Sequence, residues 1–593
     1  MHCALLIAEI SRTISEHQPS DRDRDRASLA LTCKVMSEPV LDALWATLPC
    51  VAPLLFCLPP GAIVEKLNKK KTRATYTLRR ALLPSDWDRL LLYTRRVVTF
   101  HHINGFGHTL NNIPGIPDGK RPTHLGVDGT VLCMLGTPPP GISVPEVFPR
   151  VRNVWWADAP SGSAPFLKVL LGPAVENVNI RADPAVGESE MDELAGVVAT
   201  LGQACPLVRR FIWEELLHSS ARDDFLLSPV RKAQIDAFSS AVRGWDRLEH
   251  LRCGQLDGKA LSHLATLPAL RHLTIAVGPP WQAKYNKELK LGARPFPALV
   301  NLELDATNHT FDSIIHFFSQ FSRNCRLSVT RFRATATHAS AKSVLDLCEA
   351  LEARIFVDSL REVDFFEEEA PTDPSWVLDA EHLEPLGCFK YLESLVVETG
   401  RRVDVTNRAM MCAGMAWPFL HTTVINKDRG WRVEHPSVSL PGLRALLLTA
   451  PRLTNLAVAV ETTRPMGILE QQRALRWINV AQQGPREPDI DLLDSKIEKK
   501  DMGRISFLLA VLFPHIGGDF DAGSEDGYGF RAWDADDNGQ EPEFGGVSKP
   551  EAKRQRNRWR VVAGMMLEHQ TALQWEIYEK VIRRYLAQGG ANK

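Results

Sequence analysis

The stretch Phe148-Pro149-Arg150-Val151-Arg152-Asn153-Val154-Trp155-Trp156 contains the pattern that decides the fold of this chain. Its apolar residues are Val151, Val154 and Trp156, with two residues between the first and the second and one residue between the second and the third. Such spacing suits a turn that leads into a short strand whose alternate side chains point inward. The pattern recurs at intervals of roughly 22 to 60 residues, in copies that begin at Val151, Val175, Val208, Leu248, Leu270, Leu299, Leu360, Leu392, Leu453 and Leu475.

Amphipathic stretches lie between these copies, at 191–201, 230–242, 311–321 and 343–351. Their apolar residues recur at helical spacing. Alternating strands and helices predict an α/β protein, and a compact domain with a parallel sheet would have the same alternation. We favour an irregular leucine-rich-repeat solenoid (a horseshoe), because the pattern recurs more often than a compact open sheet usually requires.

Composition excludes several classes of protein. A length of 593 residues exceeds one ordinary domain, and a net charge of −1 provides no basic field that would attract nucleic acid. The eleven cysteines have neither metal-binding nor redox spacing. No secretory or membrane-spanning segment is evident in the sequence, so we expect a cytoplasmic and/or nuclear protein with no membrane partner.

A search for catalytic and metal-binding motifs is negative. An Asp-x-Asp-x-Asn-Gly run from Asp534 copies half of a calcium loop, but its twelfth position is Gly545, where a bidentate Glu is needed. His101, His102 and His108 cluster in sequence without an evident fourth ligand. We therefore expect no catalytic residue, no metal, no cofactor and no enzymatic activity.

Two strings near the N-terminus carry a family resemblance. Leu29-Ala30-Leu31-Thr32-Cys33 is followed by Pro39-Val40-Leu41-Asp42-Ala43-Leu44-Trp45, and an apolar stripe precedes them. In this order they resemble the F-box of fungal, basidiomycete-type F-box/leucine-rich-repeat proteins. The chain departs from that pattern at Ile7, where the family has proline, and at Ser15, where it has phenylalanine.

The resemblance implies a binding protein, because an F-box performs no chemistry. Its F-box-like head would dock a Skp-type adaptor, and through it a cullin, while the repeats would present a protein substrate of a ubiquitin ligase. The alternative is a repeat scaffold for protein interactions whose degenerate head no longer docks the adaptor. The docking residues that we predict are Leu6, Ile10, Ile14, Leu29, Leu31 and Leu44.

The predicted organisation has five parts. A helical F-box-like module at 1–58 and a linker with the first-repeat junction at 59–100 precede the solenoid at 101–518. We expect an acidic, glycine-rich, disordered loop at 519–550 and a helical cap at 551–593 that would cover the last repeat.

The outward-pointing strand residues would form the concave, substrate-facing surface of the solenoid. They include Trp155, Arg181, Glu214, Arg252, Glu303, Asp305, Asp364 and Glu398. Carboxylates on adjacent strands would repel one another across about 5 Å. The sequence therefore predicts a partner with a Lys/Arg-rich segment, held mainly by the middle repeats in a contact that salt weakens, and charge reversal of Glu303 and Asp305 to Lys should weaken its capture.

Overall fold

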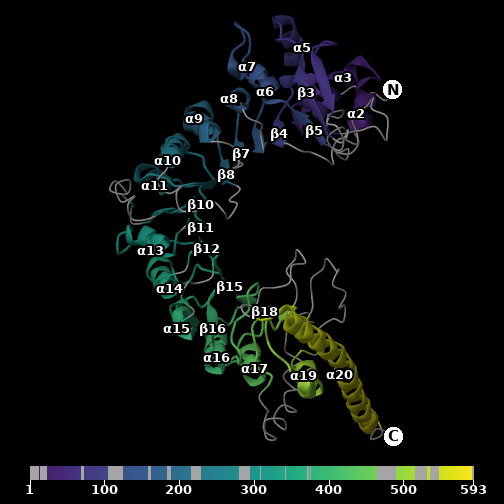
Figure 1. Cartoon of the computed structure of the whole chain (residues 1–593), viewed down its shortest axis with the longest axis vertical. Helices are drawn as coiled ribbons and strands as arrows, with labels where there is room; N and C mark the ends of the chain where they lie inside the picture. The colour runs from purple at the N-terminus through teal and green to yellow at the C-terminus, as the bar shows by residue number, and fades with distance from the viewer. Residues whose placement is uncertain are drawn as a thin grey trace. The chain divides into compact units, whose positions relative to one another are not determined.

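The computed structural model describes residues 23–67, 73–103, 124–157, 162–182, 188–215, 229–278, 294–306, 309–338, 342–369, 375–463, 489–513, 530–533 and 547–589, and the single residues 13, 291, 340 and 373. They form an α/β protein with a large, mostly parallel β-sheet, which confirms the predicted class (Figure 1). The chain divides into two compact units. The N-terminal unit contains Met1–Ala276, Gln282–Gly292 and Phe296–Leu299, and the C-terminal unit contains Val277–Trp281, Ala293–Pro295 and Val300–Lys593.

The strands of the N-terminal unit follow one another in chain order and pair in parallel. They are β1 (Thr47–Leu48), β4 (Thr99–Ile103), β6 (Asn153–Ala157), β7 (Asn177–Ala182), β8 (Arg210–Glu215), β9 (His250–Cys253) and β10 (His272–Ala276). A separate three-stranded sheet pairs β2 (Ile63–Leu67) antiparallel and β5 (His124–Val127) parallel with β3 (Arg73–Leu78).

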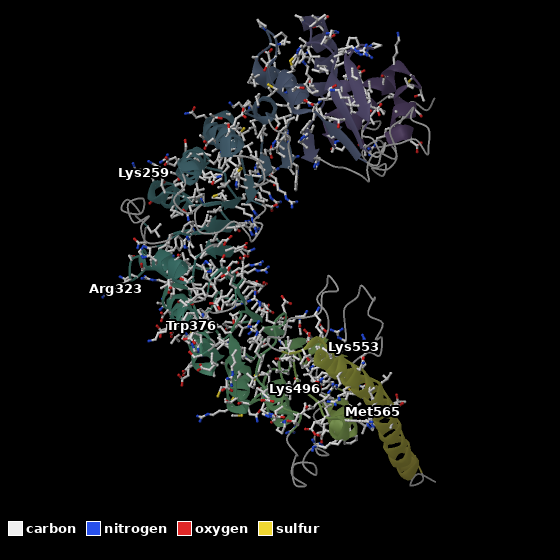
Figure 2. All side chains as sticks on the ribbon, viewed as in Figure 1. Lys259, Arg323, Trp376, Lys496, Lys553 and Met565 are labelled. Atoms are coloured by element: carbon white, nitrogen blue, oxygen red, sulfur yellow. The ribbon has the colours of Figure 1, made fainter. Side chains whose placement is uncertain are left out.

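Two of the described helices of this unit precede β1, and the others lie between strands. They are α2 (Asp23–Ala30), α3 (Lys34–Trp45), α4 (Ala52–Leu55), α5 (Pro84–Thr94), α6 (Gly129–Leu135), α7 (Val144–Val147), α8 (Ala164–Leu170), α9 (Glu188–Ala204), α10 (Pro229–Val242) and α11 (Gly258–Leu264). Figure 1 shows α9, α10 and α11 along one side of strands β7 to β10. On this helix side, Lys259 of α11 points away from the strands (Figure 2).

The C-terminal unit repeats the arrangement, again with parallel strands in chain order. Its strands are β11 (Asn301–Ala306), β12 (Arg331–Ala336), β13 (Glu362–Glu367), β15 (Ser394–Glu398), β17 (Thr422–Ile425), β18 (Asn455–Ala457), β19 (Asp489–Asp491) and β20 (Phe530–Arg531), beside a pair formed by β14 (Val377–Asp379) and β16 (Arg402–Asp404). Its helices are α13 (Asp312–Ser319), α14 (Ser343–Arg354), α15 (Ala380–Leu383), η6 (Glu384–Cys388), α16 (Asn407–Ala416), α17 (Leu440–Thr449), η9 (Lys499–Asp501), α19 (Met502–Leu512) and α20 (Lys549–Gly589).

A shared hydrogen-bond scheme explains the two-residue spacer in the repeated pattern. In the copy that begins at Val151, the backbone N–H groups of both spacer residues, Arg152 and Asn153, donate to the carbonyl oxygen of Val98. Arg152 in turn accepts from both spacer residues of the next copy, Glu176 and Asn177. The scheme recurs with the acceptors Glu176, Arg209, Glu249, Val300, Thr330, Arg361, Glu393 and His421. Two spacer residues are needed because both donate to the neighbouring repeat.

The three apolar positions of each copy form the core. Val154, Phe211 and Leu251 are almost completely buried, and each such side chain contributes about 1.5–3 kcal/mol on burial. Nine predicted copies contain strands β6, β7, β8, β9, β10, β11, β13, β15 and β18, while the copy at Leu475 lies outside the described residues. The four predicted amphipathic stretches lie on α9, α10, α13 and α14.

The described residues also show what the predicted segments contain. β1 lies inside the predicted head (1–58) and pairs with β4, and the predicted linker (59–100) contains β2, β3 and α5. Of the predicted acidic loop (519–550), the structure describes 530–533, which include β20, and 547–550. The predicted cap region (551–593) is largely one helix, α20.

Candidate functional site

The corner between α2 and α3 carries the predicted docking residues that the structure describes. Leu31 lies in the turn after α2 and is 88% exposed, and Val35 beside it is 49% exposed. Leu29, by contrast, packs against a small core that includes Met36 and Val40. Leu29 belongs to α2 and Leu31 follows the end of this helix, so the two leucines have different surroundings. The corner therefore presents Leu31 and Val35 to solvent.

The remaining predicted docking residues do not join this corner in the described part of the chain. Leu44 is half-buried on α3. Leu6, Ile10 and Ile14 lie outside the described residues. Sequence reasoning missed Val35, which lies in the first turn of α3, and no spacing in the sequence identifies it.

Charged groups anchor α3 to the segment that follows α5. Arg96 donates from its two terminal nitrogens to the Asp42 carboxylate at 2.5 Å and to the Glu38 carboxylate at 2.6 Å. The ring centroids of Trp45 and Tyr93 lie 4.4 Å apart beside this contact. Charge-assisted hydrogen bonds of this kind are roughly twice as strong as neutral ones, so they orient α3 firmly.

In the N-terminal unit, the strand face opposite the core carries an exposed aromatic side chain. Trp155 is 39% exposed on β6, and its ring lies 5.6 Å from that of His101, the paired residue on β4. His102 points to the core, where it stacks on Trp156 at 4.6 Å and burial lowers its pKa to about 4. His101 and His102 therefore lie on opposite faces of one strand, and His108 lies outside the described residues.

The same face carries charged residues on β7, β8 and β9. Arg181 on β7 is exposed and pairs in register with Glu214 on β8, while Arg252 is exposed on β9. At the strand starts, Asn177 donates to Asn153, and Asn153 donates to Thr99. The face therefore offers an aromatic surface at β6 and charges of both signs on β7 to β9.

In the C-terminal unit, the predicted row of adjacent carboxylates is interrupted. The register places Arg333 of β12 between Glu303 of β11 and Asp364 of β13. Arg333 lies 3.7 Å from the Glu303 carboxylate, and Arg331 lies 3.1 Å from that of Asp364, which is buried. The argument from carboxylate repulsion is therefore wrong, because β12 was not identified in the sequence and supplies two guanidinium groups.

The two other predicted carboxylates of this face have different surroundings. Asp305 is half-buried on β11, on the same face as Glu303. Glu398, at the end of β15, accepts a hydrogen bond from the backbone N–H of Lys427 at 2.8 Å. Burial, together with the nearby carboxylate of Asp428, raises the pKa of Glu398 to about 7. Glu398 is thus only partly charged near neutral pH.

Arg333 also contacts an aromatic ring on this face. Its guanidinium lies 4.5 Å from the ring centroid of Phe366 on β13. Such cation–π contacts hold the side chain over the strands, so the face of β11 to β13 presents a guanidinium and an aromatic ring beside the carboxylates.

The described residues hold no group of three or more His, Cys, Asp or Glu side chains that could ligate a metal. The run from Asp534 to Gly545 lies outside these residues. None of the described helices combines the length and the apolar composition needed to span a bilayer.

Neither a protein-family model nor a curated protein matches this chain.

Proposed function

We propose that this chain is the substrate-recognition subunit of a cullin-type ubiquitin ligase. Its F-box-like head would dock a Skp-type adaptor, and its repeats would bind a protein target. The chain itself would provide proximity and no bond-making chemistry, as the F-box resemblance implies.

The observation that carries the docking proposal is the apolar corner of the head. Leu31 belongs to the Leu-Ala-Leu-Thr-Cys string that resembles the F-box, and it is 88% exposed together with the half-exposed Val35. The ion pairs from Arg96 join α3, the helix that contains Val35, to the segment after α5. A partner that covered two aliphatic side chains on a pre-oriented helix pair would gain hydrophobic free energy at little ordering cost.

The parallel strand order supports leucine-rich repeats as the target-binding part. In each unit the order of strands follows the chain, whereas doubly wound α/β domains reverse their strand order at a switch point. The recurring spacer hydrogen bonds join each repeat to its neighbour, which is how stacked repeats gain stability. A horseshoe solenoid with a binding face on its strands accounts for both features.

Substitution of Leu31 tests adaptor docking directly. We expect Leu31→Asp to reduce co-purification of the full-length chain with a Skp-type adaptor by on the order of tenfold or more, since a buried apolar anchor contributes about 2 kcal/mol. The matched control is Leu448→Asp, which changes another exposed leucine, on α17, and should leave co-purification unchanged. Circular dichroism should show the same helicity for both variants.

Leu29 provides a second comparison within the same string. Because Leu29 packs against Met36 and Val40, Leu29→Asp should lower the melting temperature, whereas Leu31→Asp should not. Full adaptor retention by the folded Leu31→Asp variant would reject the docking assignment. Failure of the wild-type chain to bind any Skp-type adaptor would favour the alternative, a repeat scaffold with a degenerate head.

We also propose that the target contacts the strand face of the repeats, and a basic target segment there would contact Asp305. Because Glu303 lies beside Arg333, Glu303→Lys would disrupt an ion pair as well as the surface charge. Asp305→Lys reverses the charge at the position proposed to contact the target, and it should weaken capture of a basic target most strongly at low salt. Equal capture by this variant and the wild type would exclude a basic segment at this position.

A further inference from the structure

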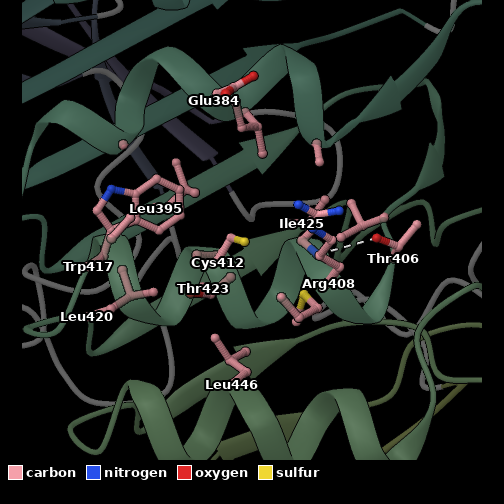
Figure 3. A pocket seen from close by; sticks show the side chains of 18 of the residues that line it. Glu384, Leu395, Thr406, Arg408, Cys412, Trp417, Leu420, Thr423, Ile425 and Leu446 are labelled. Carbon is pink, nitrogen blue, oxygen red and sulfur yellow. Dashed lines mark hydrogen bonds between the residues drawn. The ribbon is translucent and has the colours of Figure 1, made fainter.

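The C-terminal unit contains a cavity of about 420 Å³ between strands β15 and β17 and helices α15, η6 and α16 (Figure 3). Trp417 and Leu420 lie at one end of this cavity, and Thr406 and Arg408 lie at the other. Pockets for small molecules have volumes of roughly 300–1,000 Å³, and an engineered cavity of roughly 150 Å³ already binds benzene. The space is therefore large enough for a small organic molecule.

Small side chains on facing walls create this space. Thr423 of β17 occupies a core position that is leucine on both paired strands, Leu395 of β15 and Leu456 of β18. Three alanines at helical spacing face the cavity from α16, at Ala409, Ala413 and Ala416. Threonine in place of leucine, opposite an alanine-lined helix face, thus widens this space.

Thr423 also supplies an unpaired polar group. Its side chain is 5% exposed and lines the cavity, and its Oγ1 has no hydrogen-bond partner among the described residues. Trp417, by contrast, donates its indole N–H to the carbonyl oxygen of Leu386 at 3.1 Å. A buried hydroxyl without a partner is unfavourable, and such groups in native proteins usually meet a bound molecule or water.

The charged residues of the cavity lie at its rim. Glu381, Glu384 and Arg408 line it but are exposed, as is Cys412 on α16. The interior is formed by apolar side chains with the Thr423 hydroxyl among them. A buried charge would be strongly disfavoured in such surroundings, so the chemistry of the walls selects a neutral molecule.

We propose that this cavity binds a small, neutral, amphipathic molecule. Its aliphatic or aromatic body would fill the space between α16 and the strands, and one hydroxyl or carbonyl group would form a hydrogen bond with Oγ1 of Thr423. This site lies between the strand layer and the helix layer of one unit. It is independent of adaptor docking and of the strand face proposed to contact the target.

Two probes that differ by one hydroxyl test the site. Ligand-observed NMR on the full-length chain should detect binding of 4-propylphenol, with about three- to tenfold weaker binding of propylbenzene, because one hydrogen bond is absent. Thr423→Val keeps the shape and removes the hydroxyl, so it should bind the phenol no more tightly than propylbenzene, because the hydroxyl of the phenol then has no partner. Thr423→Leu replaces the hydroxyl by a larger apolar group, so it should also show no preference for the phenol.

The control variant is Met411→Leu, which changes an exposed side chain of α16 that does not line the cavity, and it should retain the wild-type preference. Ala413→Phe projects a ring into the cavity from the opposite wall and should weaken binding of both probes. The proposal is overturned if the wild type binds neither probe at millimolar concentration. It is equally overturned if Thr423→Val keeps the preference for the phenol, or if a folded Ala413→Phe variant binds both probes as the wild type does.

Discussion

At the scale of single residues, the C-terminal unit depends on a completely buried ion pair. Arg401 and Glu367 are both 0% exposed, and Arg401 donates to the two carboxylate oxygens at 2.8 and 2.7 Å. Arg401 also donates to the carbonyl oxygen of Ser340 and to the hydroxyl of Ser343, which lies at the start of α14. This pair links β13, the turn after β15 and α14 across segments that are far apart in sequence.

Removal of one partner should leave an uncompensated buried charge. We expect Arg401→Met to destabilise the protein by about 3–5 kcal/mol, and the double variant with Glu367→Leu to recover part of this loss. Chemical denaturation of the two single variants and the double variant measures the interaction free energy between Arg401 and Glu367. Lys500→Met, at an exposed ion pair with Glu498, is the control and should change stability little. Strictly additive losses in the double variant would contradict the coupling.

Glu398 should make stability depend on pH. Its folded pKa of about 7 lies above the value of about 4.3 for an unfolded glutamate, so the folded state holds the proton more tightly. Its contribution to stability is therefore present at low pH and is lost as pH rises from about 4.3 through 7. Glu398→Gln keeps an acceptor for the Lys427 N–H and removes this titration. Relative to the variant, the wild-type melting temperature should fall between pH 5 and pH 8, and parallel curves would disprove the assignment.

At the scale of elements, glycine allows α9 to approach the turn after α10. A Cβ atom at Gly202 would lie 2.6 Å from the carbonyl oxygen of Ala241, and one at Gly244 would lie 2.5 Å from that of Gly202. Both neighbours are backbone atoms, so side-chain rearrangement does not relieve the overlap. The distance between these helices is thus set by two residues without side chains.

Two alanine substitutions in α9 should distinguish the effect of helix packing on stability from the effect of helix propensity. Gly202→Ala should lower the melting temperature, because α9 and α10 must move apart. Gly196→Ala, in the same helix and with no atom within 4 Å of the added Cβ, should raise stability by about 0.5–1 kcal/mol. Thermal unfolding followed by circular dichroism compares the two variants, and equal shifts would show that the close approach does not limit packing.

At the scale of the whole molecule, α20 covers the last described repeats of the C-terminal unit. Figure 2 shows Lys553 and Met565 along this helix. Trp559 is buried and donates its indole N–H to the carbonyl oxygen of Ser495 at 2.7 Å, the same oxygen that accepts from Trp533. Gln555 accepts from the backbone N–H of Ile497 at 3.0 Å. The helix therefore closes the end of the sheet with both apolar and polar contacts.

Truncation should test this closure. A chain that ends at residue 548 loses the buried side chains of Trp559, Val562 and Met566, each contributing about 1.5–3 kcal/mol. Hydrogen exchange should become faster at 489–513 and remain unchanged at 153–215, because a repeat contacts chiefly its neighbours. The control chain ends at residue 573 and keeps these contacts. Unchanged protection at 489–513 in the shorter chain would exclude a capping role for α20.

The sequence predicted strands where all three pattern positions are apolar, as at Leu270 and Leu299. It missed β4, β12 and β17 because His102, Ala334 and Thr423 occupy pattern positions there. Each of these strands still has the two spacer residues with the shared hydrogen bonds. The backbone hydrogen bonds thus form even where a pattern position is not a large apolar residue, and such strands are not recognised from apolar spacing alone.

The sequence by itself determined the α/β class, the repeating strand–helix units and the inward face of each strand, because these follow from periodicity within a few residues. Tertiary structure alone decided which side chains meet: Arg333 between Glu303 and Asp364, and Thr423 between Leu395 and Leu456. Those pairs lie about thirty residues apart, and their register depends on the packing of the intervening helices and loops. Local spacing therefore determined the repeating units. The contacts between charged side chains and the position of the cavity depend on how neighbouring units stack.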